Sequence, residues 1–177
     1  MALRLLVSLV VVGAACGGGP LEGECVPVSG AVVVANEGWL HKNDAADHVY
    51  VNNPPASGPH YPVWASYGVH DEEPPLERGQ WVHNLEHGGI VVLIGDSASD
   101  AAMTEARAGF DAIPVDDECG HSRSILTHDH EMEVAIAVVA ADTLLVPGPL
   151  DAGVIGRDRV VEFAIACRNH APESVCR

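Results

Sequence analysis

A long irregular segment limits what this chain can fold into. From Asn36 to Arg78 the chain is dense in Pro, Gly, Asn and His, and its apolar residues follow neither a helical nor a strand period. An irregular stretch of about forty residues is uncommon in a compact domain, and such stretches tend to be functional. Most regular elements are therefore predicted after this segment, and the segment itself is a candidate for carrying the site.

Three apolar runs after this segment predict strands. Gly89 to Gly95 is a short run, rich in β-branched residues, that is typical of a buried strand. Two further strands are predicted at Ser124 to Thr127 and at Val134 to Val146. The acidic turn His128-Asp129-His130-Glu131 separates them, and the two histidines of this turn are expected to be exposed.

Two helices are predicted from caps and apolar stripes. The first begins after Ser97 or Ser99 and runs to about Asp111, and the second spans Arg157 to Asn169 and ends before Pro172. The order is irregular segment, strand, helix, strands, helix. It predicts an α+β fold, a small antiparallel sheet with two helices packed on one face, preceded by the long irregular Pro/Gly-rich N-terminal segment.

The N-terminus has the features of a secretory signal peptide. Residues 1–15 combine a positive charge at Arg4, an apolar run and small residues before Cys16. The apolar run is well short of the roughly 20 residues that span a bilayer. Cys16, followed by Gly-Gly-Gly-Pro, resembles the lipidated cysteine of a lipoprotein.

This organisation predicts three parts. Residues 1–15 are the signal peptide, residues 16–35 are the lipidated tether with the segment that leads into the domain, and residues 36–177 are a single domain. The protein is expected to be exported and membrane-anchored in the cell envelope, on its periplasmic or outer face. Plain secretion is the alternative.

Cysteine usage agrees with an oxidising compartment. Besides the lipidation site the chain has Cys25, Cys119, Cys167 and Cys176, and four cysteines in an exported chain predict two disulfide bonds. No two of them have the C-x-x-C spacing of a redox motif or a zinc ribbon. Of the possible pairings, sequence proximity favours Cys167 with Cys176, which would leave Cys25 with Cys119.

The formal net charge of −16 limits the partners. A surface this acidic repels phosphate backbones, which argues against nucleic acid as a partner. The same charge disfavours contact between the body of the protein and an anionic membrane. Contact with the membrane is therefore expected through the lipid anchor alone, and the sequence does not identify a protein partner.

Ten histidines, against nine lysines and arginines together, are the strongest compositional oddity. His60 lies in Asn-Pro-Pro-Ala-Ser-Gly-Pro-His-Tyr-Pro, where the prolines and the glycine restrict the backbone around one imidazole. His83 and His87 lie in Val-His-Asn-Leu-Glu-His-Gly-Gly. A restricted backbone around polar side chains is what a preorganised site requires.

These two histidine elements resemble a bacterial family known as domain of unknown function 3105. The family pattern is a Pro-Pro-x-Ser-Gly-x-His element followed by a His-x-Leu-Glu-His-Gly element, and the resemblance runs from about Glu37 to Glu173. The chain departs from the family at His128 and at Ala140-Ala141, where members commonly have Pro and Trp. The family has no assigned function, so the function must come from the chemistry of the residues.

The spacing of His83 and His87 decides whether both can bind one metal ion. On a helix, residues four apart stand about 6 Å apart on one face. On a strand the same two residues are separated by about 13 Å, at roughly 3.3 Å per residue. Gly88-Gly89 is a suitable helix stop, so we expect a short helical turn that carries both imidazoles.

A transition-metal site follows from this turn. His60 on its restricted loop is the expected third ligand, and His41 or His48 is expected to complete the set. Imidazoles without a free thiolate suit zinc, copper, nickel or iron, and export favours copper or zinc. Glu86 is expected either to orient an imidazole from outside the coordination sphere or to act as a base. The predicted function is metal binding, with its role unknown.

Two other functions remain open. His83 to His87 matches H-x-x-E-H, the inverted zincin motif, in which Glu86 would be the general base and Glu162 the third zinc ligand. A small zinc-dependent hydrolase is therefore one alternative. In the other alternative the histidines only hydrogen-bond a packed loop, and the protein is a non-catalytic structural or partner-binding lipoprotein.

Overall fold

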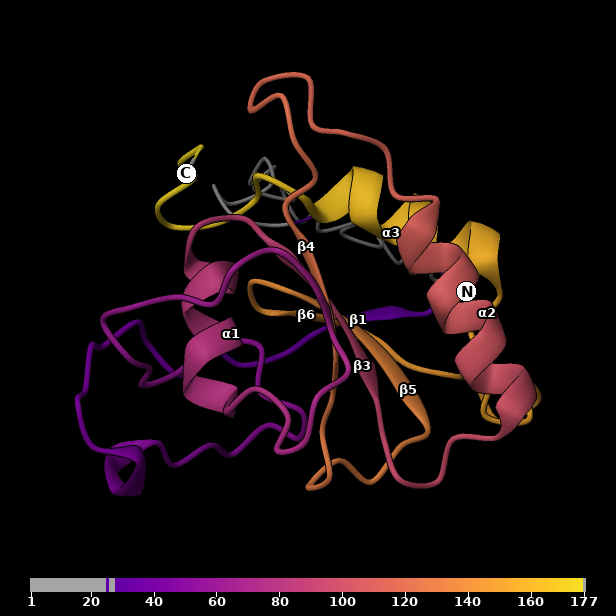
Figure 1. The fold of residues 1–177 in the computed structure, drawn as a ribbon, viewed down its shortest axis with the longest axis horizontal. Coiled ribbons are helices and arrows are strands. Elements are labelled where there is room, and N and C mark those ends of the chain that lie inside the picture. Colours follow the sequence, from indigo (N-terminus) through magenta and orange to yellow (C-terminus); the bar gives the residue numbers. More distant parts are fainter. Residues whose placement is uncertain (1–24, 26–27, 177) are drawn as a thin grey trace, which may run out of the picture.

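The structure of the protein is a computed structural model that describes Cys25 and residues 28–176 (Figure 1). The predicted signal peptide, the lipidation site at Cys16 and most of the predicted tether lie outside these residues. Within the described residues, no helix combines the length and the apolar character needed to span a bilayer.

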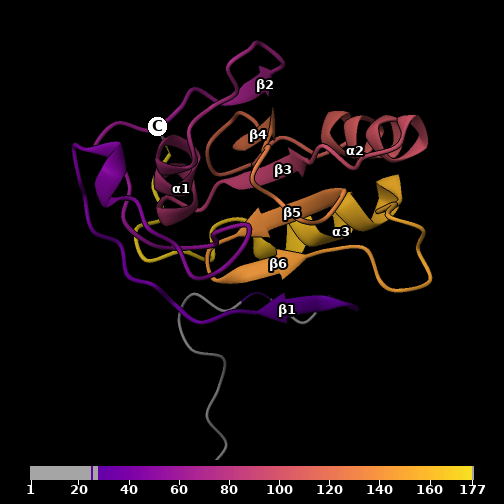
Figure 2. The ribbon, with the colours of Figure 1, turned by 90° about the horizontal axis from the view of Figure 1, so that it is seen from below.

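A six-stranded mixed sheet forms the centre of the domain, with the strand order β1-β6-β5-β3-β4-β2 (Figure 2). The strand β3 (Ile90–Ile94) is buried along its whole length between β5 and β4, which confirms the prediction of a buried strand there. The other strands are β1 (Ala31–Val33), β2 (Gly68–His70), β4 (Ser124–His128), β5 (Ile136–Ala140) and β6 (Thr143–Leu145).

The α+β class is confirmed, but the prediction of a purely antiparallel sheet is wrong. Both β2 and β3 run parallel to β4, whereas β5 is antiparallel to β3, and β6 is antiparallel to β5 and β1. The strands β3 and β4 are parallel because the helix α2 (Asp100–Asp111) connects them. A helical crossover returns the chain to the end of the sheet at which the first strand began, so the two strands point the same way.

The predicted strand over residues 134–146 is two strands joined by a tight turn. β5 ends at Ala140, and β6 begins at Thr143 and pairs antiparallel with it. Asp142 in the turn has a φ of 54°, a left-handed conformation that Asp tolerates better than most residues. Both strands are apolar and buried, so the hydrophobic pattern does not reveal the reversal between them.

The helices α2 and α3 (Arg157–Cys167) cover one face of the sheet, as predicted (Figure 1). Ser99 caps α2 by accepting the backbone N–H of Ala102. Val160 and Phe163 of α3 are fully buried in the core that these helices form with the sheet. The apolar stripes read from the sequence are therefore the faces that these helices bury.

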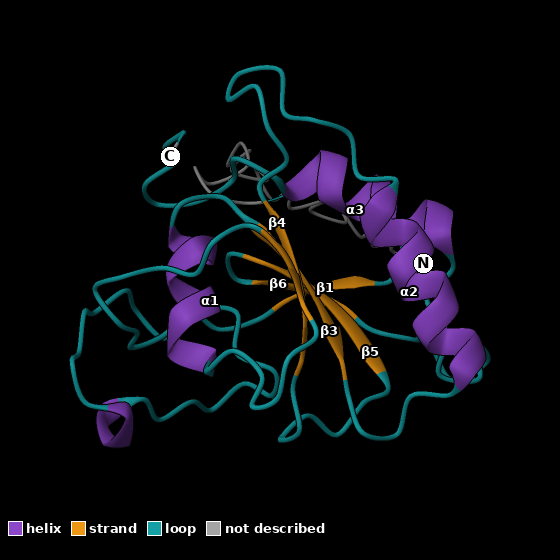
Figure 3. Cartoon of the chain, viewed as in Figure 1, coloured by secondary structure: helices purple, strands orange, loops and turns teal. Residues whose placement is uncertain are grey.

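The opposite face of the sheet carries the helix α1 (Arg78–Glu86) and the irregular segment (Figure 3). Trp81 and Leu85 of α1 lie in the core of this face together with Val91 of β3. The irregular segment includes the 3-10 helix η1 (Ala45–Asp47) and the short strand β2. Together the sheet and the irregular segment bury nearly every residue of α1, polar ones included.

The disulfide bonds join Cys25 to Cys167 and Cys119 to Cys176. The prediction of two bonds is confirmed, and the pairing favoured by sequence proximity is wrong. Cys167 is on the buried face of α3, where it meets the start of the described chain. The chain then turns back across the domain before Cys176, so nearness in sequence does not become nearness in space.

Candidate metal centre

The helix α1 presents His83 and Glu86 from its last turns, and His87 caps its C-terminal end. A capping box starts the helix: the Glu77 side chain accepts a backbone N–H of the first turn, and the Gln80 side chain accepts the Glu77 N–H at 3.0 Å. The two hydrogen bonds of this capping box satisfy amide groups that would otherwise lack partners. The first residue of the helix is therefore fixed, and so is the position of its last turn, which carries the site residues.

Gly88 ends the helix as the sequence predicts. Its φ of +80° is left-handed, and the N–H of Gly89 then donates to the carbonyl of Asn84 at 2.8 Å. The expected short helix with both imidazoles on one side is confirmed, because the Nε2 atoms of His83 and His87 lie 2.8 Å apart.

The irregular segment brings His41 and His60 together through a parallel β-bridge. The N–H of His60 donates to the carbonyl of Leu40 at 3.0 Å, and the N–H of Lys42 donates to the carbonyl of His60 at 2.7 Å. The two imidazole centroids lie 4.9 Å apart, and each lies 4.9 Å from the centroid of His83. Backbone pairing in the irregular segment thus completes a site that begins on α1.

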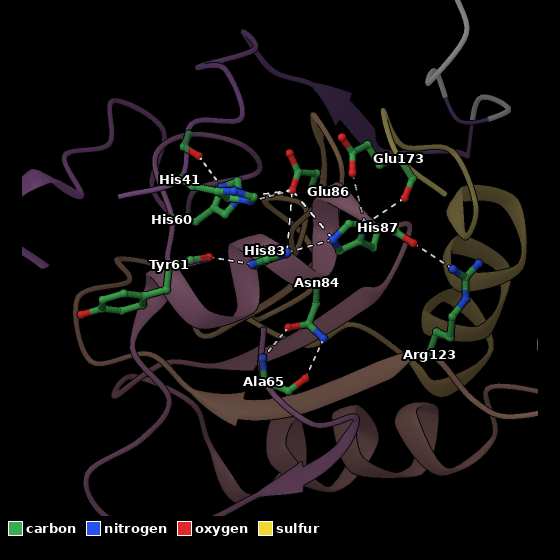
Figure 4. A network of polar contacts seen from close by, with 11 residues as sticks. His41, His60, Tyr61, Ala65, His83, Asn84, Glu86, His87, Arg123 and Glu173 are labelled. Carbon is green, nitrogen blue, oxygen red and sulfur yellow. Dashed lines mark hydrogen bonds and ion pairs between the residues drawn. The ribbon is translucent and has the colours of Figure 1, made fainter. Parts of the chain in front are cut away.

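Four imidazoles surround one carboxylate oxygen (Figure 4). The Oε2 atom of Glu86 lies 3.2 Å from Nε2 of His60, 3.4 Å from that of His41, 3.8 Å from that of His83 and 3.9 Å from that of His87. We call these five residues the His–Glu cluster. One group of ligand atoms that all lie within 4.8 Å of one another comes from His41, His60, His83 and Glu86, and a second comes from Glu86, His87 and Glu173.

Three of the four rings are held through Nδ1 by a backbone carbonyl. The distances are 2.8 Å from His60 to Gly58, 2.6 Å from His83 to Tyr61, and 3.0 Å from His87 to Glu173. A carbonyl oxygen only accepts hydrogen bonds, so each Nδ1 must carry the proton. In the neutral ring the lone pair is then on Nε2, which fixes the tautomer and the orientation that a metal ligand needs.

The lone pairs of the cluster face one another. With both Nδ1 atoms protonated and both rings neutral, the Nε2 atoms of His83 and His87 are two acceptors at 2.8 Å. The Nε2 atom of His60 faces the Glu86 carboxylate at 3.2 Å in the same way. Only a cation, either a proton or a metal ion, can join atoms arranged like this.

The cluster is buried except on one side. His60 is 0 %, His83 is 2 % and Glu86 is 4 % exposed, whereas the side chain of His41 is 51 % exposed. Burial lowers the pKa of His83 to about 4, against the opposing hydrogen bond to the Tyr61 carbonyl. Burial also lowers the pKa of His60. Burial therefore favours the neutral form of both rings, which is the form that binds metal, and His41 marks the side open to solvent.

Asn84 fixes the loop that faces the cluster. Its side chain accepts the N–H of Ala65 at 3.0 Å and donates to the Ala65 carbonyl at 2.9 Å. Trp64, the preceding residue, lies edge-on to His83 and His87, with ring centroids at 5.1 Å and 5.2 Å. The loop therefore limits the rotation of both imidazoles and keeps their Nε2 atoms directed at the cluster.

The structure distinguishes the two candidates for the last histidine. His41 lies in the cluster, whereas the ring of His48 packs against Tyr61 with a centroid distance of 4.3 Å. The Nε2 atom of His48 lies 3.2 Å from the carbonyl of Lys42. His48 thus supports the irregular segment, and it is absent from both ligand groups of the described residues.

The acidic turn after β4 differs in part from the prediction. His130 is exposed there, with its Nδ1 2.6 Å from Asp96 and its Nε2 3.5 Å from Glu73. His128 is not exposed as expected: it is the last residue of β4 and is half-buried. Pairing with β3 continues through this residue and accounts for its burial.

The acidic residues also lie where sequence reasoning did not expect them. Glu162 is exposed on α3, whose core lies on the opposite face of the sheet from α1, so it cannot meet His83. Glu86 faces the Nε2 atoms of the four histidines, so it lies among the candidate ligands and not behind an imidazole. Glu173 was missed, because it is 86 residues from His87 and no motif links the two.

The fold and the cluster define an α+β domain with a buried set of imidazole and carboxylate groups that could hold a metal ion. The family described as "Protein of unknown function (DUF3105)" matches residues 41–174, so the chain belongs to this family, as its histidine elements predicted. Neither the curated proteins nor the solved structures contain a match to the chain.

Proposed function

We propose that this protein binds one divalent transition metal ion, copper(II) or zinc(II), in the His–Glu cluster. The observation that carries the proposal is the set of mutually facing lone pairs on His60, His83, His87 and Glu86. Burying acceptors against acceptors is costly, since none of them gains a hydrogen bond for the water that it gives up. A metal ion between them removes this cost.

The spacing of the ligand atoms supports binding to one ion. Atoms bound at about 2.0–2.1 Å lie about 2.9 Å apart at a right angle and about 4.1 Å apart on opposite sides of the ion. The distances from Glu86 Oε2 to the Nε2 atoms of His60, His41 and His83 are 3.2 Å, 3.4 Å and 3.8 Å, which fall in this range, and these four residues form one ligand group. His87 lies 3.9 Å from the same oxygen and belongs to the second ligand group, with Glu86 and Glu173. The 2.8 Å between His83 and His87 is close to the lower end of the range.

The donor types favour a divalent ion. Imidazole and carboxylate groups suit zinc(II) and copper(II), whereas copper(I) prefers thiolate and thioether groups. The four described cysteines are paired in disulfides. Met132 is buried in the core on the α1 side of the sheet. Glu86 would also neutralise one of the two charges of the ion.

Export and a lipid anchor at Cys16 remain part of the proposal. The signal-like residues 1–15 and the Cys-Gly-Gly-Gly-Pro sequence support them, and two disulfide bonds agree with an oxidising compartment. The protein would then hold its metal ion at the membrane surface of the cell envelope. There the acidic body, with a formal charge of −16, would favour the approach of cations.

The two alternatives account for less of the geometry. A zinc hydrolase of the inverted zincin type needs Glu162 as a ligand, and that residue is on the other face of the sheet. A purely structural role explains the Nδ1 hydrogen bonds of three rings. That role requires a proton, and so a charged ring, between the Nε2 atoms of His83 and His87, whereas a metal ion would join them with both rings neutral.

Titration of metal-free protein with zinc(II) and with copper(II), followed by calorimetry, tests the proposal. We expect the wild type to bind one ion per chain. His60→Ala and Glu86→Gln should each lose much of the affinity for the ion. The Glu86→Gln substitution keeps the shape of the side chain and removes its charge. His130→Ala is the matched control, because His130 is an exposed histidine outside the cluster. Equal binding by the wild type and the double variant His60→Ala/Glu86→Gln would overturn the proposal.

A further inference from the structure

The C-terminal tail, residues 168–176, reaches the His–Glu cluster through the backbone of Glu173 (Figure 4). The Glu173 carbonyl accepts Nδ1–H of His87 at 3.0 Å. The Glu173 N–H donates to the carbonyl of Glu86 at 3.1 Å. Glu86 and His87 are therefore both hydrogen-bonded to the C-terminal tail, and the tail fixes the orientation of the His87 ring.

A buried arginine ties the tail to the end of α1. Arg123 is 4 % exposed, and its Nη1 donates to the carbonyls of His87, at 2.8 Å, and of Val175, at 2.9 Å. Asp116 neutralises its charge by accepting from Nε at 3.2 Å and from Nη2 at 3.0 Å. One guanidinium group thus joins the cluster residue, the tail and the turn before β4.

The Cys119–Cys176 disulfide anchors the tail beside this arginine. Cys176 follows Val175 directly, and the N–H of Cys119 donates to the carbonyl of Asp116 at 3.2 Å. Cys176 is exposed and Cys119 half-buried, whereas in the other disulfide Cys25 is half-buried and Cys167 is 1 % exposed. Thiol–disulfide exchange requires access to a sulfur atom, so a reductant reaches the bond of the tail first.

We propose that the Cys119–Cys176 disulfide controls the affinity of the metal site, by holding the tail against His87. This inference rests on the proposed function. A dithiol reductant would transfer two electrons and two protons to the bond, leaving thiols at Cys119 and Cys176 and forming a disulfide in the reductant. The freed tail would withdraw the acceptor from Nδ1 of His87, and partners of this kind typically change metal affinity about 10–100-fold.

Zinc(II) and copper(II) titrations of two disulfide variants test the inference. We expect Cys119→Ser/Cys176→Ser to bind about 10–100-fold more weakly than the wild type. Cys25→Ser/Cys167→Ser is the matched control, because it removes the disulfide on the other side of the sheet, and it should keep the wild-type affinity. In a His87→Ala background, loss of the Cys119–Cys176 bond should have no further effect, since the tail acts through His87.

Each outcome bears on a different claim. A wild type that binds neither ion would refute the proposed function itself. A wild type that binds, with equal affinity in the Cys119→Ser/Cys176→Ser variant, would refute only the control by the disulfide. Equal weakening in both disulfide variants would also refute it, because the loss would then be global.

A second variant covers the case in which the Cys119→Ser/Cys176→Ser protein does not fold. Arg123→Lys keeps a positive charge beside Asp116 but lacks the planar fork that reaches both carbonyls. We expect the same weakening of metal binding in a variant whose circular dichroism is that of the wild type. Unchanged affinity in this variant would refute the role of the tail.

Discussion

The Nε2 atoms of His83 and His87 lie 2.8 Å apart at the end of α1, while the Nδ1 atom of each ring donates to a backbone carbonyl from another part of the chain. The helix supplies the spacing of the two rings, and the carbonyls of Tyr61 and Glu173 supply their tautomer. Neither the helical spacing nor the carbonyl hydrogen bonds alone would turn the two rings into a ligand pair. Together they give two lone pairs directed at one point, which is the basis of the following predictions.

His83→Ala should remove the stabilisation of the protein by metal. The variant leaves the Tyr61 carbonyl without its partner, which costs the metal-free protein about 1–3 kcal/mol. At a zinc concentration 100 times the Kd, the wild type should gain about 2.7 kcal/mol of unfolding free energy, and the variant far less. Thermal unfolding with and without zinc measures the stability of the metal-free protein and the stabilisation by zinc. His48→Ala is the control, because His48 lies outside the cluster and this variant should keep the stabilisation by zinc.

A purely structural role of His83 makes a different forecast for added metal. The loss of stability in His83→Ala would then be the same with and without zinc. The wild type would then show no thermal shift on addition of zinc or copper. That pair of results would contradict the metal site.

Gly88→Ala should destabilise the domain and disturb the site. Gly88 has a φ of +80°, and a Cβ there would lie 2.9 Å from the Cα of Asn169. The left-handed conformation alone costs an alanine about 1–2 kcal/mol, and the contact adds to it. Gly120→Ala is the control for the conformation, since Gly120 has a φ of +70° and nothing within 4 Å of its Cβ position. Urea unfolding should show a larger loss for Gly88→Ala, and equal losses would contradict a backbone clash.

Asp116→Asn should destabilise the protein at neutral pH. The substitution leaves Arg123 buried and without its charged partner, which costs about 3–5 kcal/mol. Burial raises the pKa of Asp116, but the Glu118 N–H, the Asn169 side chain and the charge of Arg123 outweigh it and lower the pKa below 3.8. The folded state therefore holds the carboxylate charged at a pH where the unfolded state already binds a proton.

The pH dependence of this pair follows from the sign of the shift. The stability that the Asp116 carboxylate contributes is fully present above about pH 4, and it is lost as the pH falls through the lowered pKa. Urea unfolding from pH 7 to pH 2.5 should show the wild type losing stability faster than Asp116→Asn in acid, so that the two curves approach each other. Parallel curves over this range would contradict the lowered pKa.

Cys16→Ser should abolish lipid attachment. A thioether-linked lipid requires the sulfur atom of Cys16, so labelled fatty acid should enter the wild type and not the variant. Cys119→Ser is the control, since it removes a cysteine that is paired in a disulfide and should keep the label. Equal labelling of wild type and Cys16→Ser would contradict the lipoprotein assignment while leaving export open.

Local sequence determined the helices, the buried strand β3 and one half of the site. The helix stop at Gly88 and the spacing of four residues between His83 and His87 act within one turn of chain, so they could be read directly. The cap at Ser99 and the apolar stripe of α3 were readable for the same reason. The specific Pro/Gly/His elements were enough to predict the family.

Tertiary structure alone decided the rest, because it depends on contacts between residues far apart in the chain. The choice of His41 over His48 follows from a β-bridge with His60, which no local pattern records. The parallel pairing of β3 with β4 follows from the path of α2 over the sheet. The turn of the C-terminal tail sets the disulfide pairing and brings Glu173 to His87. Sequence fixes which side chains are available within a turn or a strand, whereas the packing of the whole chain fixes which of them meet.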